Sequence, residues 1–393
     1  MTRPFEGIRI IDATQVLAGP FAAYQLAVLG ADVIKLEHPE EPDQTRDSGT
    51  DRALNRLGMG TSYLTQGSNK RSITLNLKTE AGCEILKRLV ARADIIVENY
   101  RPGAFAALGL GYEVMSKINP RLIYCSISAF GQDGPRGSQT AYDHVIQATS
   151  GLMATTGTEE VNPIKFGSPA VDYATGTMGA FALASALFQR ERTGRGQRID
   201  LAMLDVAMIM MSSHLTGYLR NGVEPKPAGN RHLHATNSCY AAREGLVMLG
   251  ASNLRQQRRL WQALERPDMA KRTNEEREHD RDREAALLAE ILKRERRTNG
   301  KCSSKRVTSR RRGCAIWRRR FATRNLRAAR SPITIARRPG SMALSVCRLP
   351  RSGLPMAGRA SRRRRRPWGP TPTRCWLSTA TTRIRSRRFA KAA

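Results

Sequence analysis

Acidic residues are absent from the last quarter of this chain. Residues 301–393 contain 25 arginines and 3 lysines but no aspartate or glutamate, which gives them a net charge of +28. Residues 1–300 hold all 34 acidic residues and the other 38 basic residues, so their net charge is only +4. The overall net charge of +32 therefore describes the end of the chain, whereas residues 1–300 have the charge balance of an ordinary soluble protein.

Long apolar segments and regularly spaced cysteines are also missing. No segment of about eighteen residues is both apolar and uncharged. An apolar strand is expected from Gly7, and the residues before it lack the pattern of a signal peptide. We therefore expect a cytoplasmic protein without a membrane partner. Cys83, Cys125 and Cys239 lie far apart, which indicates neither a zinc site nor disulfides. The sequence also lacks a GxGxxG loop, the fingerprint of dinucleotide binding.

Apolar strands alternate with helical segments at the start of the chain. The expected strands are 7–12, 31–37, 72–77, 95–99 and 122–128, and the expected helices are 21–29, 79–91 and one near Met115. This alternation predicts an α/β fold with a mostly parallel sheet covered by helices. Ligands bind beyond the carboxyl ends of the strands in such sheets, which points to residues 16–20, 100–103 and 130–135.

A single carboxylate precedes a long apolar run of small residues. Asp172 follows a Gly-Ser-Pro turn, and residues 173–189 are predicted to form a buried helix that starts at Asp172 and stops before Gly194. In one interpretation Asp172 is an N-cap, which stabilises the helix by about 1 kcal/mol. In the other interpretation it is a carboxylate nucleophile, and nearby backbone N–H groups stabilise an oxyanion.

Seven segments, in this order, form a specific pattern: DATQVLAGPFAAYQLAVLGADVIKLEHP, NKRSITLNLKTEAG, ADIIVENYRPGA, LGLGYE, NPRLIYCSISAFGQDGP, AYDHVIQATSGLMATTG and DYATGTMGA with RERTGRGQRIDLAMLD. From about residue 5 to 215 the chain resembles the class III CoA-transferases, the group of the formyl-CoA and carnitine CoA-transferases, with alpha-methylacyl-CoA racemase as a relative. The resemblance implies a Rossmann-like CoA-binding domain, a smaller second domain and an interlocked homodimer. It implies no metal, and no cofactor beyond coenzyme A as substrate and product.

The family's nucleophilic aspartate falls on Asp172, so the resemblance favours the catalytic interpretation of this residue. It implies transfer of CoA from an acyl-CoA donor to a carboxylic acid acceptor through an aspartyl covalent intermediate. The carboxylate attacks the acyl-CoA carbonyl to give a mixed anhydride, the CoA thiolate returns to form an aspartyl thioester, and an incoming acid takes the CoA. Because every partner is a carboxylate or a thiolate, little proton transfer is needed.

The residues that contact CoA in the family correspond by position to short segments that follow the predicted strands of this chain. Lys78 keeps a cation for the phosphates, and Arg101 is a candidate substitute for cations that are missing elsewhere. The formyl-CoA enzyme has cationic residues at the positions of His38, Ala107 and Thr140. Leu17 replaces a glutamine of that enzyme, which favours a larger or less polar acyl group. The expected CoA-binding residues are Leu17, Ala18, His38, Leu75, Asn76, Leu77, Lys78, Asn99, Tyr100, Arg101, Thr140, Ala141, Tyr142 and Asp143.

One position separates the transferase from the racemase branch of the resemblance. The racemase needs a histidine immediately before the aspartate that matches Asp143, to exchange the α-proton. Tyr142 occupies that place here, and His144 is displaced by two positions. A transferase is therefore favoured, with an acyl-CoA racemase or epimerase as the alternative, and His144 is interpreted as a packed or partly exposed imidazole.

The resemblance weakens after residue 200. The Met-rich run 203–211 is interpreted as core packing, and a strand pair over 240–250 and a helix over 253–264 are expected to follow. Glu284 lies in a highly charged helical segment and is expected on a solvated face. The expected domains are a CoA-binding α/β domain (1–200), a linker helix with a Pro/Gly connection (201–230), a partial small domain (231–298) and an aberrant, disordered Arg-rich tail (299–393).

Two accounts compete for the tail beyond about residue 298. A basic nucleic-acid-binding arm would use its arginine runs for phosphates and Trp317, Trp368 and Trp376 for bases, but no binding module is evident, so such binding would be non-specific. The favoured account is a shifted reading frame. Residues 370–376, PTPTRCW, can be written in codons that give ADTDEVL one base earlier, similar to the HTDEVL-like ending typical of the family. The chain as written is then expected to be inactive or unstable.

Overall fold

The computed structural model describes residues 3–242 and 245–294, together with the backbone of three short strands, β9 (Arg312–Gly313), β10 (Ala336–Arg338) and β11 (Ser341–Ala343). The expectations for the tail, namely its disorder, its nucleic-acid arm and its shifted reading frame, concern residues that lie outside this description apart from those strands.

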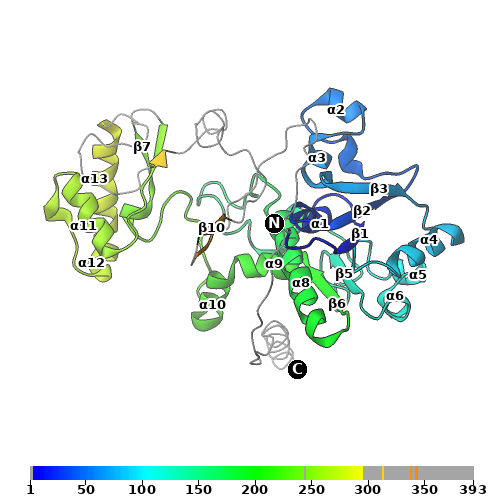
Figure 1. Ribbon diagram of the computed structural model, residues 1–393. Coiled ribbons are helices and arrows are strands. Elements are labelled where there is room, and N and C mark those ends of the chain that lie inside the picture. The colour runs from blue at the N-terminus through cyan, green and yellow to red at the C-terminus, as the bar shows by residue number, and fades with distance from the viewer. Residues whose placement is uncertain (1–2, 243–244, 295–311, 314–335, 339–340, 344–393) are drawn as a thin grey trace. The chain divides into compact units, whose positions relative to one another are not determined.

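Six strands form the central sheet, and every neighbouring pair is parallel. The strand order is β3-β2-β1-β4-β5-β6. This arrangement confirms the expected parallel α/β fold (Figure 1). The strands are β1 (Arg9–Ala13), β2 (Asp32–Glu37), β3 (Lys70–Thr74), β4 (Ile95–Glu98), β5 (Ile123–Ser128) and β6 (Arg198–Ala202).

The strand order places a crevice beside β1 and β4. The chain adds strands outward from β1 to β3 and then returns to the other side of β1 with β4. At such a reversal the loops that follow the two central strands diverge toward opposite faces, and ligands bind between them. The loops concerned begin at Thr14, after β1, and at Asn99, after β4.

Both faces of the sheet are buried under helices. Along β1, Ile10 packs into a cluster with α1 (Ala18–Val28) and α8 (Ala170–Thr193). The next residue, Ile11, packs into a second cluster that includes residues of α4 (Glu80–Val90) and α6 (Tyr112–Ile118). Successive side chains of a strand point to opposite faces, so this alternation fixes the sheet between two apolar layers.

A third apolar cluster involves later residues. It includes Tyr240 from β7 (Cys239–Ala242), Trp261 from α11 (Leu254–Ala263) and Leu288 from α13 (Arg281–Arg294). β7 pairs with β8 (Gly245–Met248) in antiparallel fashion, as the expected strand pair requires. The other helices are α2 (Arg52–Arg56), α3 (Thr61–Gly67), α5 (Ala104–Ala107), α7 (Asp143–Ser150), α9 (Met203–Met210), α10 (Ser212–Asn221) and α12 (Asn274–His279).

Three local expectations differ from the structure. α8 begins at Ala170, two residues before the predicted start, with Pro169 as its N-cap. β3 ends at Thr74 rather than residue 77, because Leu75 and Leu77 pack into the apolar cluster with α4 instead of continuing the strand. Glu284 is fully buried rather than solvated, and its carboxylate accepts a hydrogen bond from Trp261 Nε1 at 3.2 Å. Among the described residues, no helix has the length and apolar character needed to cross a membrane.

Candidate active site

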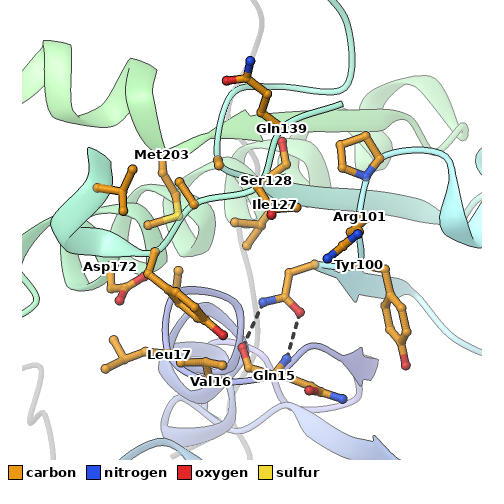
Figure 2. A pocket seen from close by; sticks show the side chains of 18 of the residues that line it. Gln15, Val16, Leu17, Tyr100, Arg101, Ile127, Ser128, Gln139, Asp172 and Met203 are labelled. Atoms are coloured by element: carbon orange, nitrogen blue, oxygen red, sulfur yellow. Dashed lines mark hydrogen bonds between the residues drawn. The ribbon is translucent and has the colours of Figure 1, made fainter. Parts of the chain in front are cut away.

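A cavity of about 610 Å³ opens at the carboxyl ends of β1, β4 and β5 (Figure 2). Its wall combines the loops after these strands with residues at the starts of α1, α7, α8 and α9. The cavity therefore lies in the crevice that the strand order predicts. Its lining residues are Gln15, Val16, Leu17, Ala18, Gln44, Asn99, Tyr100, Arg101, Pro102, Ile127, Ser128, Ala129, Gln139, Thr140, Ala141, Tyr142, Val145, Asp172 and Met203.

Asp172 and eight of the expected CoA-binding residues come together in this wall. The eight are Leu17, Ala18, Asn99, Tyr100, Arg101, Thr140, Ala141 and Tyr142.

The other expected CoA-binding residues do not line the cavity. His38 follows β2, and its Nδ1 accepts a hydrogen bond from the backbone N–H of Glu41 at 3.1 Å. Asn76 and the exposed Lys78 follow β3 at the same edge of the sheet. The remaining three, Leu75, Leu77 and Asp143, are buried.

Asp172 is a half-buried member of the first turn of α8. Pro169 is the N-cap of this helix and makes no side-chain cap hydrogen bond. The carboxylate of Asp143 instead accepts the backbone N–H groups of Val171 and Asp172, through Oδ2, at 2.8 and 3.0 Å. The N-cap interpretation of Asp172 is therefore wrong, because another residue performs the capping and leaves the Asp172 side chain in the cavity wall.

The surroundings of Asp172 favour its protonated form. Burial is the larger cause, the negative charge of Asp143 is the second, and together they raise the pKa of Asp172 to about 7. A carboxylate with a raised pKa is more basic than an ordinary aspartate and still ionises near neutral pH. Such a group can attack an electron-poor carbonyl without the help of a neighbouring base.

Asp143 connects three segments beneath the cavity wall. Besides capping α8, it accepts a hydrogen bond from Nε2 of Gln147, one turn further along α7. The same Gln147 amide accepts the backbone N–H of Phe166 at 2.8 Å. These bonds tie α7 to the turn that precedes α8, and they make Asp143 a structural support of Asp172 rather than a wall residue.

Tyr142 and His144 flank Asp143 at the surface. Tyr142 is 57% exposed and lines the cavity, whereas His144 is exposed without lining it. Their rings are roughly parallel, with centroids 6.3 Å apart. The cavity thus presents the phenol of Tyr142, whereas the imidazole of His144 lies outside its wall.

For several residues of the cavity wall, the sequence alone gives no indication that they belong to a site. Gln44 lies in a 3-10 turn and Gln139 in a loop, and isolated glutamines in such segments are ordinary surface residues. Met203 was expected to pack in the core, and it is 6% exposed but also reaches the cavity. Gln15 and Ser128 could have been found, because each lies at the carboxyl end of a predicted central strand.

CoA-transferase family III is the family whose model matches the chain, over residues 5–308. The succinate–glutarate CoA-transferase of Agrobacterium fabrum is 40% identical over 265 residues, which are 66% of this chain and 66% of the relative. The succinyl-CoA:glutarate CoA-transferase of Homo sapiens is 38% identical over 75% of this chain and 67% of the relative. For the formyl-CoA:oxalate CoA-transferase of Streptomyces avermitilis the identity is 46%, over 52% of this chain and 48% of the relative. The chain thus spans about half to two thirds of the length of these relatives.

Solved structures show the same similarity. A CAIB/BAIF family protein from Brucella suis has a TM-score of 0.65 and 36% sequence identity, and the match covers 76% of this chain and 80% of that protein. Rv3272 from Mycobacterium tuberculosis has a TM-score of 0.70 and 26% identity, covering 89% and 93% respectively.

Proposed function

The chain belongs to CoA-transferase family III, and we propose that it moves CoA from an acyl-CoA donor to a carboxylic acid acceptor through a covalent intermediate on Asp172. The observation that carries this proposal is the placement of Asp172. Its carboxyl group lines the cavity, its helix is capped by another residue, and its pKa is raised to about 7.

In each step of the proposed reaction, an acyl group forms a bond to one oxygen or sulfur atom and loses its bond to another. A carboxylate oxygen of Asp172 attacks the acyl-CoA carbonyl, and the CoA thiolate leaves from the tetrahedral intermediate to give a mixed anhydride. The thiolate then attacks the Asp172 carbonyl, releases the donor acid as its carboxylate, and forms an aspartyl thioester. The acceptor carboxylate attacks this thioester and expels the thiolate, which finally attacks the acceptor carbonyl of the second anhydride and frees Asp172.

CoA binding is proposed to use the loops around the cavity. Arg101 is the only cation among the described lining residues, and it is exposed, as a group that meets phosphates in solvent should be. Lys78 and His38 follow the carboxyl ends of β3 and β2, on the same edge of the sheet, where they extend the expected CoA-binding surface beyond the cavity.

The acyl group is proposed to be larger or less polar than a formyl group. Leu17 and Met203 contribute apolar side chains to the wall that also carries Asp172. The names of the relatives suggest the panel for the test: succinyl-CoA as donor, with glutarate, malate or oxalate as acceptor. This test and the other activity tests use the chain with its minus-one reading frame restored from about codon 298, because the chain as written is expected to be inactive or unstable. We expect faster transfer to glutarate than to oxalate, measured as formation of the new acyl-CoA. Absence of transfer to every acid in the panel would contradict the proposal.

A deuterium experiment separates transfer from racemisation. An α-chiral acyl-CoA incubated in deuterated water without an acceptor acid is expected to gain no α-deuterium, because tyrosine is a poor base at neutral pH and the exposed His144 lies outside the cavity wall. Mass spectrometry of the recovered acyl-CoA measures the incorporation. Rapid uptake of deuterium would instead favour the racemase alternative.

The pH dependence of transfer should report the ionisation of Asp172. The nucleophile is the ionised form, so activity should rise with pH through about 7, the raised pKa of Asp172. Asp143→Asn removes one of the two causes of that shift, so the midpoint of this rise should move to lower pH. The variant also weakens the cap of α8, which should lower the free energy of unfolding by about 1 kcal/mol.

The control for this experiment is Asp282→Asn, because Asp282 is exposed and does not line the cavity. Profiles of kcat/KM against pH for the three proteins give the comparison. A midpoint in Asp143→Asn that stays unchanged or moves upward would argue against the electrostatic role of Asp143.

We also propose a homodimer. Large apolar side chains are exposed along α8, α9 and α10, among them Phe181 at 59%, Phe188 at 62% and Leu219 at 67%. Exposed apolar groups on this scale favour a covering partner, and the resemblance to interlocked dimers names a second copy of the chain.

A further inference from the structure

The backbone of one loop in the cavity wall is bound by a side chain from another strand. This cavity loop, residues 14–17, follows β1 and contributes Gln15, Val16 and Leu17 to the wall. The amide of Asn99 holds Gln15 at both backbone groups: its Oδ1 accepts the Gln15 N–H at 2.8 Å, and its Nδ2 donates to the Gln15 carbonyl at 2.9 Å (Figure 2). Both polar ends of the Asn99 side chain are thereby used within the protein.

The neighbours of Gln15 in the cavity loop are held in the same way. Side chains from four other positions bind the N–H and C=O groups of the two flanking residues. The pairs are Thr14 N–H with Asp12 Oδ1 (3.1 Å), Thr14 C=O with Lys35 Nζ, Val16 N–H with Asp43 Oδ2 (3.2 Å) and Val16 C=O with Gln66 Nε2 (2.8 Å).

Val16 shows why so many bonds are needed. Its φ is +70°, in the left-handed region, which β-branched residues rarely occupy because of steric strain. Strained backbone of this kind persists only where the surrounding structure over-determines it, and it concentrates at functional sites. The bonds to Gln15 and Val16 are therefore what keeps the cavity loop in this shape.

The shape of the cavity loop is transmitted to the helix that carries Asp172. The loop runs directly into α1, and a methyl group added at Gly176 of α8 would lie 2.7 Å from the carbonyl oxygen of Ala18. The Phe21 ring of α1 also packs edge-to-face on Tyr173, with centroids 4.9 Å apart. Because no space separates these helix starts, a shift of the cavity loop must move α1 against the first turns of α8.

We propose that Asn99 is a positioning residue for the transfer reaction, rather than a CoA contact through its side chain. It locks the strained cavity loop, and through the contact of α1 with α8 it fixes the geometry between the bound acyl group and Asp172. The proposal rests on the proposed function, because it assigns to Asn99 a role in the chemistry at Asp172.

The test compares Asn99→Ala with Asn119→Ala. Asn119 is a matched control, because its Nδ2 also donates to backbone carbonyls, of Val90 and Ala93 at 3.0 and 2.8 Å, and its Oδ1 accepts the Arg121 N–H, but it lies before β5 and away from the cavity wall. We expect kcat to fall on the order of 100-fold in Asn99→Ala, with KM for acyl-CoA near the wild-type value, as for a small misplacement of reacting groups. Asn119→Ala should lose stability but keep kcat.

A second variant tests the link to strain. Val16→Gly places a residue that adopts φ +70° at no steric cost, so the double variant with Asn99→Ala should regain most of the lost kcat. Hydrogen exchange of the Gln15 amide should quicken in Asn99→Ala and remain slow in Asn119→Ala. If Asn99→Ala does not fold, Asn99→Asp, which keeps the acceptor but loses the donor, replaces it.

Wild-type kcat in Asn99→Ala despite faster exchange at Gln15 would overturn the proposal, as would an equal loss of kcat in Asn119→Ala. If the proposed function itself is wrong, the frame-restored chain without substitutions transfers no CoA although its Gln15 amide stays protected from exchange.

Discussion

In the chain with its minus-one reading frame restored from about codon 298, replacement of Asp172 by asparagine is expected to abolish CoA transfer while CoA binding is retained. The side chains have nearly the same shape, and the backbone N–H bonds from α8 to Asp143 do not depend on the side chain of Asp172. The amide of asparagine cannot form the mixed anhydride, so kcat should fall by about 10⁴-fold or more, the scale seen when a nucleophile is removed. Initial rates of transfer and the dissociation constant of CoA are the two measurements.

A trapping experiment identifies the covalent intermediate directly. Hydroxylamine added during turnover should convert the acylated carboxyl of Asp172 into a hydroxamate, and mass spectrometry of the peptide should locate the modification. Asp282→Asn, which changes an exposed carboxylate outside the cavity wall, should transfer CoA and be trapped like the chain without substitutions. Near wild-type transfer in Asp172→Asn would leave this residue without a catalytic role, and capping could not replace it, because Asp143 already caps α8.

Periodicity in the sequence was sufficient for the parallel sheet, whereas Asp172 was assigned to the site by the resemblance. The apolar runs that became β1, β2, β4 and β5 are short and separated by helical segments, and each central strand is buried on both faces. Such runs predict a parallel sheet from local information alone. The crevice follows from the same pattern, because parallel strands end at one edge.

The support of the site could not be predicted, because it depends on contacts between distant parts of the sequence. The cap of α8 comes from Asp143, 29 positions before Asp172, whereas capping rules examine only the residue next to the helix. The partner of Asn99 is Gln15, 84 positions earlier. From the sequence alone, both Asp143 and Asn99 could be assigned only by resemblance, as CoA contacts.

The burial of Glu284 has the same origin. A charged helical segment predicts solvated faces, but this carboxylate lies in the interior, where the indole of Trp261, 23 positions earlier, donates a hydrogen bond to one of its two oxygens. Burial raises the pKa of Glu284, which is the cost of placing an acidic group beside an apolar cluster.

Restoring the minus-one reading frame from about codon 298 is expected to convert an inactive or unstable chain into an active dimer. The match to the family model ends at residue 308, although the chain continues to residue 393. Residues 301–393 carry a net charge of +28 and no acidic residue. Charges of one sign repel one another, and few apolar contacts are then available to offset an ordering entropy of about 1 to 2 kcal/mol per residue.

The apolar side chains exposed on α8 and α10 belong to the surface that the restored C-terminal segment and the second copy of the chain are together expected to cover. Phe181, Phe188 and Leu219 each expose more than half of their surface in the chain as written. Apolar surface that lacks its cover favours aggregation, so solubility should respond to the sequence of the tail as strongly as activity does. Weak, salt-sensitive binding of polyanions is expected of any chain with so many arginines, and it does not distinguish the accounts.

The deciding comparison is therefore between the chain as written and the frame-restored chain, expressed and purified in parallel. The soluble fraction, the mass in light scattering and the rate of CoA transfer should all increase in the restored chain, and Asp172→Asn in that chain should remove transfer but leave solubility and mass unchanged. A soluble dimer of equal activity from the chain as written would contradict the shifted frame. So would a preference of about a hundredfold for one nucleic-acid sequence at physiological salt, because only a tail selected for recognition would acquire it.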